Sequence, residues 1–275
     1  MTNFPIERYP ARITARRVQI GRVSVHDVIV PELVRFVRSA VMQGTQVTLY
    51  YANAHAVRLA DQNPQFREDL AGAHVVFCDS FGVQLASRLL GQPLRSRMTP
   101  PAWLGDLVAT LPARLATFYL LGDEAEVVSL AATKLPLTHP PSHVVGHHHG
   151  FFAMEGADND LVVQRINEAS PTVLLVGMGM PRQERWIAAN GPRVRALVVM
   201  AVGALFRRIA GLEPRPHPWF VNHGFEWVTR LGSHPVTMFD RYVIGLPKFA
   251  TIVARQQLRS WSPFRKAPPP PGPHP

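Results

Sequence analysis

Cysteine is almost absent from this chain of 275 residues, which carries only Cys78. One cysteine excludes an internal disulfide framework and a metal site built from cysteines, and it is typical of a protein in a reducing compartment. Long hydrophobic runs are missing too. The longest, from Ala196 to Phe206, is far shorter than the roughly twenty residues of a membrane-spanning helix. Because the N-terminus also lacks the apolar core of a secretory signal, we expect neither a membrane span nor export.

The composition allows one substantial core, with 47% hydrophobic and 17% charged residues. A chain of this length fits one α/β domain with an appendage, or two small domains. The net charge is +10, and between Arg207 and Lys266 there are ten Lys or Arg residues against three acidic ones. Such an excess favours a nucleic acid, an anionic membrane surface or a polyanionic substrate as partner, and charge alone does not choose among them.

Apolar stretches that resemble buried strands alternate with helical patterns through most of the chain. The strands are expected at residues 47–51, 73–78, 116–121, 143–146, 172–176 and 196–201. The continuous apolar run at 172–176 is typical of a strand buried on both faces. The alternation predicts an α/β fold, with a mostly parallel sheet and helices on both of its faces.

Changes in composition divide the chain into four segments. Residues 1–19 are expected to be a flexible, basic lead-in, and residues 20–211 to be the sheet domain. Residues 212–262 begin with a proline-broken connector and end in an amphipathic helix at 238–257, and the proline-rich tail 263–275 is expected to be disordered. The sequence leaves two interpretations of the 212–262 appendage open. In one, its helices pack on the sheet domain; in the other, their aromatic and basic residues lie on the inner face of a membrane.

The stretch from Pro171 to Asn190 joins a strand to a helix at 182–189. Gly177 and Gly179 give the connecting turn backbone freedom, and Pro181 suits a first helical position. Such a loop presents unpaired N–H groups at the positive end of a helix, an arrangement suited to an anion such as a nucleotide phosphate. The glycines would also serve close packing of the helix on the strand, so both interpretations stand.

Asp79 occupies the equivalent place after the strand at 73–78, where open α/β sheets gather their ligands. Asp79 or Ser80 would alternatively only cap the helix that follows, just as Asn53 is placed to cap the helix after its own strand.

The run His147-His148-His149 is the one feature that invites a metal interpretation. It has no partner cysteine and no helical spacing, and neighbouring residues on an extended chain point in opposite directions. We expect a loop with at most one functional histidine, and no metal site.

Eight blocks of residues follow one another in a recognisable order. They are Asn53-Ala54-His55, Val75 to Gly82, Arg97-Met98-Thr99, Tyr119 to Gly122, Gly146 to Phe151, Val176 to Glu184, Gly224 to Leu231 and Arg241-Tyr242. Together they resemble the WecG/TagA/CpsF family of bacterial glycosyltransferases (glycosyltransferase family 26), over a span from about Ile20 to Phe249. The block from Val176 to Glu184 is the most specific.

The resemblance implies a Rossmann-like core in a cytoplasmic enzyme, peripheral on the inner face of the membrane through its C-terminal appendage. It implies inverting transfer of a hexose-type sugar from a UDP-sugar to an undecaprenyl-diphosphate-linked saccharide, in the synthesis of an exopolysaccharide or another cell-envelope polymer. No cofactor and no catalytic metal are implied, and no recognised motif supports a nucleic-acid partner. The donor sugar (glucose, N-acetylmannosamine or its uronic acid), the acceptor saccharide and homo-oligomer formation stay open.

Carried over by position, the resemblance implies that Asp79 is the general base, a role that needs a carboxylate within hydrogen-bond reach of the acceptor hydroxyl. The residues implied for substrate binding are Asn53, Arg97, Thr99, Gly177, Gly179, Gln183 and Glu184. Among them, Asn53 and Gln183 would orient sugar or nucleotide groups, and Arg97 would lie by phosphates. Three appendage residues would neutralise a diphosphate, because guanidinium pairs bidentately with phosphate oxygens. They are Arg215, Arg230 and Arg241, for which a solvated helix face is the other explanation.

Three positions depart from the family pattern. Ser80 stands where the family has glycine, and Tyr51-Ala52 stands where it has Thr-x. The segment from Gly203 to Arg208 corresponds to Gly-x-x-Phe-Asp-Phe and places a base, Arg207, where the family has an acid. Such changes would alter donor or acceptor choice, or mark lost activity. The alternative function is therefore a catalytically weakened nucleotide-binding or scaffolding member of a polysaccharide assembly complex.

Overall fold

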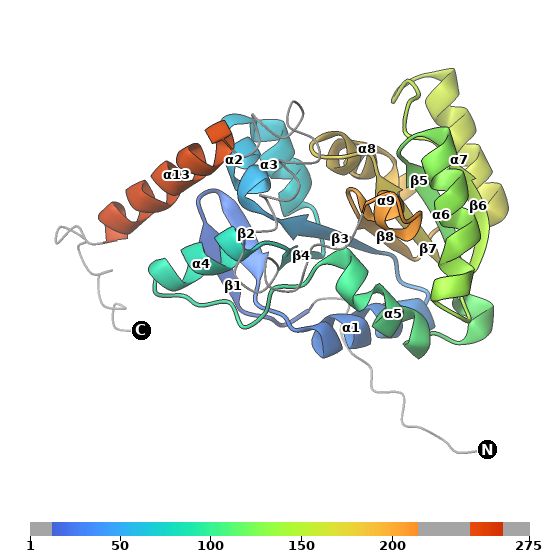
Figure 1. Cartoon of the computed structure of the whole chain (residues 1–275), viewed down its shortest axis with the longest axis horizontal. Coiled ribbons are helices and arrows are strands. Elements are labelled where there is room, and N and C mark those ends of the chain that lie inside the picture. The colour runs from blue at the N-terminus through green and yellow to red at the C-terminus, as the bar shows by residue number, and fades with distance from the viewer. Residues whose placement is uncertain (1–12, 214–242, 261–275) are drawn as a thin grey trace, which may run out of the picture.

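Residues 13–213 and 243–260 are described by the structure, a computed structural model, and they are built around one parallel sheet between layers of helices (Figure 1). The six strands lie in the order β4-β3-β8-β7-β5-β6, and every neighbouring pair is parallel. Their bounds are β3 Val47–Ala52, β4 Val75–Cys78, β5 Thr117–Gly122, β6 His143–His148, β7 Val173–Gly177 and β8 Val198–Ala201. The predicted α/β, Rossmann-like fold is confirmed.

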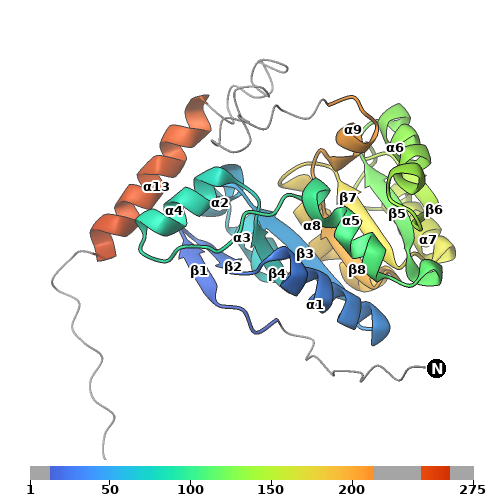
Figure 2. The ribbon, with the colours of Figure 1, turned by 60° about the horizontal axis from the view of Figure 1, so that its bottom comes forward.

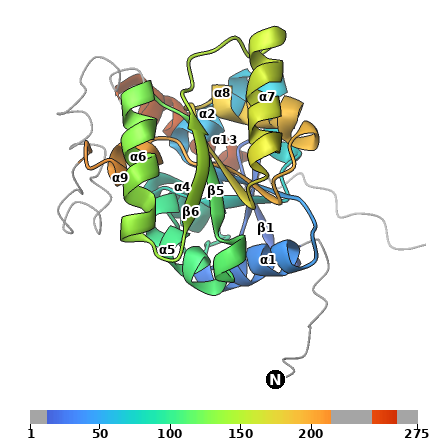
Figure 3. The same ribbon diagram turned by 90° about the vertical axis from the view of Figure 1, so that its right-hand side faces the viewer.

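Two series of helices cover the two faces of this sheet, and Figure 3 shows α6 and α7 on opposite sides of β5 and β6. One series is linked by neighbouring contacts and consists of α1 (Val30–Met42), α5 (Pro100–Thr110), α9 (Leu205–Ile209) and α6 (Ala125–Thr138). The other consists of α2 (Ala54–Gln62), α3 (Pro64–Ala71), α8 (Arg182–Asn190) and α7 (Ala157–Ala169). A further helix, α4 (Phe81–Leu89), lies beside β1.

The central strands are buried because both of their faces are covered. Each residue from Val173 to Val176 is 0% exposed, as a continuous apolar run predicts. On the α5 side, Trp103 meets Phe77 edge to face, with ring centroids 5.7 Å apart. On the α8 side, the indole Nε1 of buried Trp186 donates to Asn159 Oδ1 at 2.8 Å. This bond ties α8 to α7.

Helix α5 has no counterpart among the predicted helices. It begins at Pro100-Pro101, and two consecutive prolines resemble a break in helical structure. Proline is nevertheless tolerated in a first helical turn, where the missing N–H has no intrahelical partner in any case. The buried face of α5 then forms from Trp103, Leu104, Leu107 and Val108.

Two peripheral elements pack on the β4 side of the domain. An antiparallel hairpin joins β1 (Arg17–Ile20) to β2 (Val23–His26), so ordered structure starts before the expected boundary at residue 20. Helix α13 (Gly245–Ser260) packs on α2, as Figure 2 also shows. Its Gln256 accepts from Gly21 N at 2.7 Å and donates to Gln19 O at 2.8 Å.

The part of the appendage that is described therefore packs on the sheet domain, with Phe249 and Val253 buried. The predictions for residues 214–242 and for the tail from residue 261 lie outside the described residues. Among the helices that are described, none is both long enough and apolar enough to cross a membrane.

The expectation for the histidine run was wrong in one respect. His147 and His148 end strand β6 and are not in a loop, because β6 continues its parallel pairing with β5 to His148. In the described part of the chain, no three histidine, cysteine or acidic residues are grouped in a way that could hold a metal ion.

Two neighbouring strands, β5 and β7, end on glycines, and a third glycine follows the end of β8; all three lie in close contact with a neighbouring strand end. A Cβ on Gly122, which has φ +142°, would overlap the carbonyl of Gly177 in β7. A Cβ on Gly177 would lie 2.8 Å from the carbonyl of Gly203, which follows β8. A Cβ on Gly203, at φ +55°, would overlap the hydroxyl of Tyr51 in β3. We call Gly122, Gly177 and Gly203 the glycine row, and it lets four strand ends approach more closely than side chains would allow.

Gly122→Ala should lower the free energy of unfolding by about 3 kcal/mol or more, because its methyl group collides with β7 in addition to straining the backbone. Gly44→Ala is the matched control: its φ is +67° and nothing lies within 4 Å of the added carbon, so it should cost about 1 kcal/mol. Urea unfolding of both variants measures the difference. Equal losses would show that the glycine row is not closely packed.

Candidate active site

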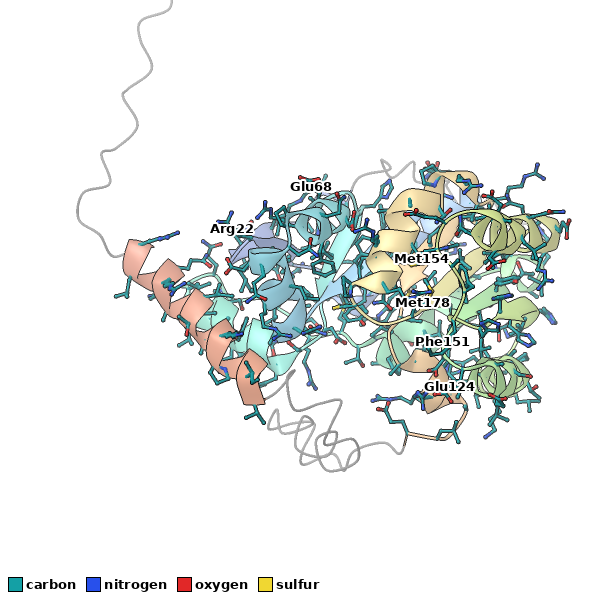
Figure 4. The ribbon with its side chains drawn as sticks, turned by 90° about the horizontal axis from the view of Figure 1, so that it is seen from above. Arg22, Glu68, Glu124, Phe151, Met154 and Met178 are labelled. Carbon is teal, nitrogen blue, oxygen red and sulfur yellow. The ribbon has the colours of Figure 1, made fainter. Side chains whose placement is uncertain are left out.

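A cleft of about 460 Å³ follows the carboxyl ends of the strands. The glycine row forms part of its floor, because Gly177 and Gly203 line it. Six of the predicted site residues line this same cleft: Asn53, Asp79, Arg97, Thr99, Gly177 and Gly179. Figure 4 shows two further lining residues, Met178 and Phe151, with Glu124 farther out. The predicted residues therefore share one cavity although they come from different strand ends.

Asp79 lies where β4 ends, and its backbone N–H donates to Ala52 O at 3.0 Å, across to the end of β3. The capping role falls to its neighbour, because Ser80 Oγ accepts from Val83 N at 3.3 Å at the start of α4. The carboxylate of Asp79 is therefore not used as the cap. Serine in place of the family's glycine at position 80 is explained by this cap.

Arg97 and Thr99 reach the same end of the cleft through the segment between α4 and α5. The N–H of Met98 donates to Cys78 O at 2.7 Å, which holds this segment against the end of β4. Thr99 then precedes the first residue of α5. Burial, together with the charge of Asp79, raises the pKa of the Cys78 thiol to about 12. The thiol is therefore protonated at neutral pH and is unsuited to act as a nucleophile.

Asn53 performs the capping role that the sequence indicates. Its Oδ1 accepts from Ala56 N at 2.9 Å at the start of α2, and the residue is only 4% exposed. Because Asn53 also lines the cleft, the cap fixes its side chain at the cleft wall.

The loop between β7 and α8 supports both interpretations of its glycines. Gly177 is packed against Gly203 and Phe206, whereas Gly179 has open space around it and φ +74°. The carbonyl of Gly179 accepts from Gln183 N at 2.9 Å, so the loop leads directly into α8. Met178, Gly179 and Met180 line the cleft. Arg182, the first residue of α8, also lines the cleft, so the positive end of the helix dipole lies beside it.

Gln183 and Glu184 do not line the cleft, since both are 0% exposed. Gln183 lies directly behind it. Its Nε2 donates to the Tyr51 hydroxyl at 3.2 Å, and its Oε1 accepts from Gly203 N at 3.1 Å. Tyr51 and Gly203 are lining residues, so Gln183 holds β3 and the end of β8 together from behind. Tyr51, which departs from the family's Thr-x, is part of this network.

Glu184 is a buried acid whose only described side-chain partner is the amide of Gln183, at 2.7 Å from Oε1. Its Oε2 has no hydrogen-bond partner among the described residues. The pKa of Glu184 is raised to about 8, chiefly by burial and to a smaller extent by the charge of Asp69, while hydrogen bonds from Gln183 and from the backbone of Glu184 itself oppose the rise. Glu184 is therefore mostly protonated at neutral pH.

Four charged residues of the cleft were not predicted as site residues: Asp123, Arg182, Arg208 and Glu213. Asp123 follows the end of β5 as Asp79 follows the end of β4, so its place after a strand was the available signal. Arg182 Nη2 donates to the carbonyls of Gly150 and Phe152, at 3.0 and 2.6 Å. It thereby fixes the loop after β6 beside the first turn of α8. The predicted arginines Arg215, Arg230 and Arg241 lie outside the described residues.

The raised pKa of Glu184 predicts a pH dependence of stability. The folded protein retains a proton that the unfolded chain releases above the ordinary pKa of 4.5, so this contribution falls as pH rises from about 4.5 to about 8. Glu184→Gln removes the titration and keeps an acceptor for Gln183. Its free energy of unfolding relative to the wild type should therefore increase between pH 5 and pH 8, as measured by urea unfolding. The exposed Glu126→Gln is the control; a pH-independent difference for Glu184→Gln would contradict the assignment.

Comparison with known proteins agrees with this geometry. Residues 18–263 match the model of the glycosyl transferase WecG/TagA/CpsF family. Two similar relatives are N-acetylglucosaminyldiphosphoundecaprenol N-acetyl-beta-D-mannosaminyltransferases of Staphylococcus aureus. That of strain NCTC 8325 / PS 47 is 31% identical over 179 residues, which is 65% of this chain and 69% of the relative. That of strain MRSA252 is 30% identical over the same length and shares. The chain belongs to the WecG/TagA/CpsF family of glycosyl transferases.

Proposed function

We propose that the protein is an inverting glycosyltransferase that uses a UDP-sugar donor and an undecaprenyl-diphosphate-linked saccharide acceptor. The observation that carries the proposal is the shared cleft: the carboxylate of Asp79 and the loop at the start of α8 line one cavity. A carboxylate suits deprotonation of a hydroxyl, and a helix N-terminus suits a diphosphate. A group suited to activate the acceptor hydroxyl and a loop suited to bind the donor diphosphate thus line the same cavity.

The names of the relatives support the choice of substrates. They transfer N-acetylmannosamine to an N-acetylglucosaminyl-diphosphoundecaprenol. Among the three donor sugars left open by the sequence, N-acetylmannosamine is therefore the first to test, as UDP-N-acetylmannosamine. The same names favour a lipid-linked amino sugar as the acceptor, in the synthesis of a cell-envelope polymer.

The mechanism we propose is a single displacement. Asp79 takes the proton of the acceptor hydroxyl while that oxygen attacks the anomeric carbon on the face opposite to UDP, so the configuration inverts. The bond between the sugar and the diphosphate breaks, and negative charge develops on UDP. The dipole of α8 and the guanidinium of Arg97 would stabilise that charge from the cleft. Arg215, Arg230 and Arg241 would add positive charge from the appendage. No metal ion and no cofactor are required in this scheme.

Asp79→Asn should reduce transfer of N-acetylmannosamine by roughly 100-fold to 10,000-fold, because an amide cannot accept the proton of the hydroxyl. Binding of UDP should change little, since the substitution is isosteric. Transfer is measured with radiolabelled donor and a synthetic lipid-diphosphate acceptor, and binding by calorimetry.

Asp106→Asn is the control, because Asp106 is exposed on α5 and does not line the cleft. It should retain wild-type transfer. Near-normal turnover of Asp79→Asn would show that Asp79 is not the base.

We also propose that the protein is cytoplasmic and binds peripherally to the inner face of the membrane, on the side where α13 lies. Helices α13 and α4 expose the apolar residues Leu85, Leu89 and Leu258, which are 41, 59 and 72% exposed. Basic residues accompany them on the same two helices: Arg88, Lys248, Arg255 and Arg259. Leu246 near the start of α13 lines the cleft, so a lipid-linked acceptor held at this surface would lie close to Asp79.

Reversing three charges of α13, with Lys248→Glu, Arg255→Glu and Arg259→Glu together, should weaken binding to vesicles of anionic lipid about tenfold or more. Each basic residue near an anionic surface contributes about 1 kcal/mol. Vesicle flotation measures the bound fraction. The matched control reverses three exposed arginines on other elements, Arg114, Arg165 and Arg195. Equal losses in both variants would assign the attraction to net charge and contradict a binding surface on α13.

A second candidate function is a nucleotide-binding scaffold without transfer activity, motivated by the departure at Arg207. It predicts that UDP-sugars bind but that no sugar reaches a lipid acceptor for any donor tested. The ion pairs of Arg207 with Asp123 and Glu124 favour an intact donor site.

A further inference from the structure

Arg207 occupies the position where the family pattern has an acid, and two acidic neighbours lie against it. A single nitrogen, Nη2, lies 2.8 Å from Asp123 Oδ1 and 2.8 Å from Glu124 Oε1. Arg207 belongs to α9, whereas both acids belong to the turn between β5 and α6. The side chain of Asp123 is only 9% exposed, and that of Glu124 is 56% exposed. The arginine therefore joins two elements that are far apart in the sequence.

The turn that Arg207 holds is a junction between three loops of the cleft. Asp123 donates its backbone N–H to Gly177 O at 3.0 Å and accepts from Gly150 N at 2.9 Å. It thereby links the loop after β7 to the loop after β6. Asp123 itself lines the cleft, so a movement of this turn would displace the wall of the cavity.

The turn is held in an uncommon backbone conformation. Asp123 has φ +54°, in the left-handed region that side chains rarely adopt. Its carboxylate accepts from its neighbour, Glu124 N, at 2.9 Å, which is a local bond that favours this region for aspartate. The ion pair with Arg207 adds a contact from outside the turn.

The positive charge of Arg207 also affects the electrostatics of the cleft. Without Arg207, the nearly buried carboxylate of Asp123 would lie beside the β7 loop with no basic partner among the described residues, and such a charge is costly. It would also repel a diphosphate bound at the same loop. Arg207 neutralises the charge of Asp123, and its own side chain is only 33% exposed.

From this geometry we propose that Arg207 is a positioning residue of the donor site. It fixes the turn Gly122 to Glu124 and lowers the combined negative charge of Asp123 and Glu124 by one unit, so that an anionic nucleotide diphosphate can lie in the cleft beside Asp123. The basic residue at position 207 therefore pairs with the acidic residues beside it, and it is not a sign of lost activity. This inference rests on the proposed function, because it takes the donor to be a nucleotide diphosphate.

The first test is local and does not need a ligand. Amide hydrogen exchange in Arg207→Ala should be about tenfold faster at Asp123 and Gly150, whose N–H groups make the two junction bonds, and unchanged in the strands. Arg207→Lys should restore most of the protection, because lysine keeps the charge. Arg195→Ala removes an exposed arginine before β8 and is the control. Unchanged exchange at both amides in Arg207→Ala would overturn the positioning role.

The second test measures UDP binding by calorimetry. Arg207→Ala should raise the Kd for UDP roughly tenfold to 100-fold, because the carboxylate of Asp123 would then repel the diphosphate across a partly buried site. The same substitution in an Asp123→Asn, Glu124→Gln background should raise it much less, because no carboxylate is left to repel the diphosphate. An equal increase in both backgrounds, or none in either, would overturn the neutralising role.

The two tests separate this inference from the proposed function. Wild-type protein that binds no UDP would refute the proposed donor, and with it the neutralising role, whereas the exchange measurement would still decide whether Arg207 holds the turn.

Discussion

Close approach of backbone to backbone at the carboxyl ends of the strands is the constraint on which the cleft depends. Gly122, Gly177 and Gly203 lie against one another and against Tyr51, with no room for a Cβ at their contacts. Because these strand ends are drawn together, residues from several of the loops that follow them line one cavity. The same parallel order places Asp79 at one end and the loops of β5 and β6 at the other. The cleft is thus a property of the sheet, and its residues are supplied by the loops.

Polar groups outside the cleft hold these loops in place. Gln183 links Tyr51 to the backbone of Gly203 from the buried side, and the neighbouring Glu184 is kept mostly protonated by its burial. On the outer side, Arg207 links α9 to the turn after β5. A buried hydrogen-bond network and a largely covered ion pair both favour a single arrangement of the cavity. A site arranged in advance suits transfer between two substrates, because little ordering remains to be done when they bind.

Much of this arrangement was predictable from the sequence. Continuous apolar runs located the strands. The strand-end rule indicated Asp79, the start of a helix indicated the Gly177 loop, and the family resemblance added Asn53; all of them line one cleft. Other features depend on contacts between distant residues. The burial of Gln183 results from Tyr51 and Gly203 on two other strands, and no local pattern distinguishes it from an exposed glutamine in a first helical turn. The role of Arg207 likewise depends on acids more than eighty residues earlier. Helix α5 was not predicted; its buried face, formed by Trp103, Leu104, Leu107 and Val108, depends on packing against the sheet.

The central claim is that donor diphosphate and acceptor hydroxyl meet in one cleft, between the start of α8 and Asp79. An experimental structure of the wild-type protein with bound UDP tests it most directly. The account predicts that the diphosphate lies within hydrogen-bond distance of backbone N–H groups between Met178 and Arg182, in the cavity that Asp79 lines. A diphosphate bound at the amino ends of the strands, or on the outer surface of α13, would contradict it.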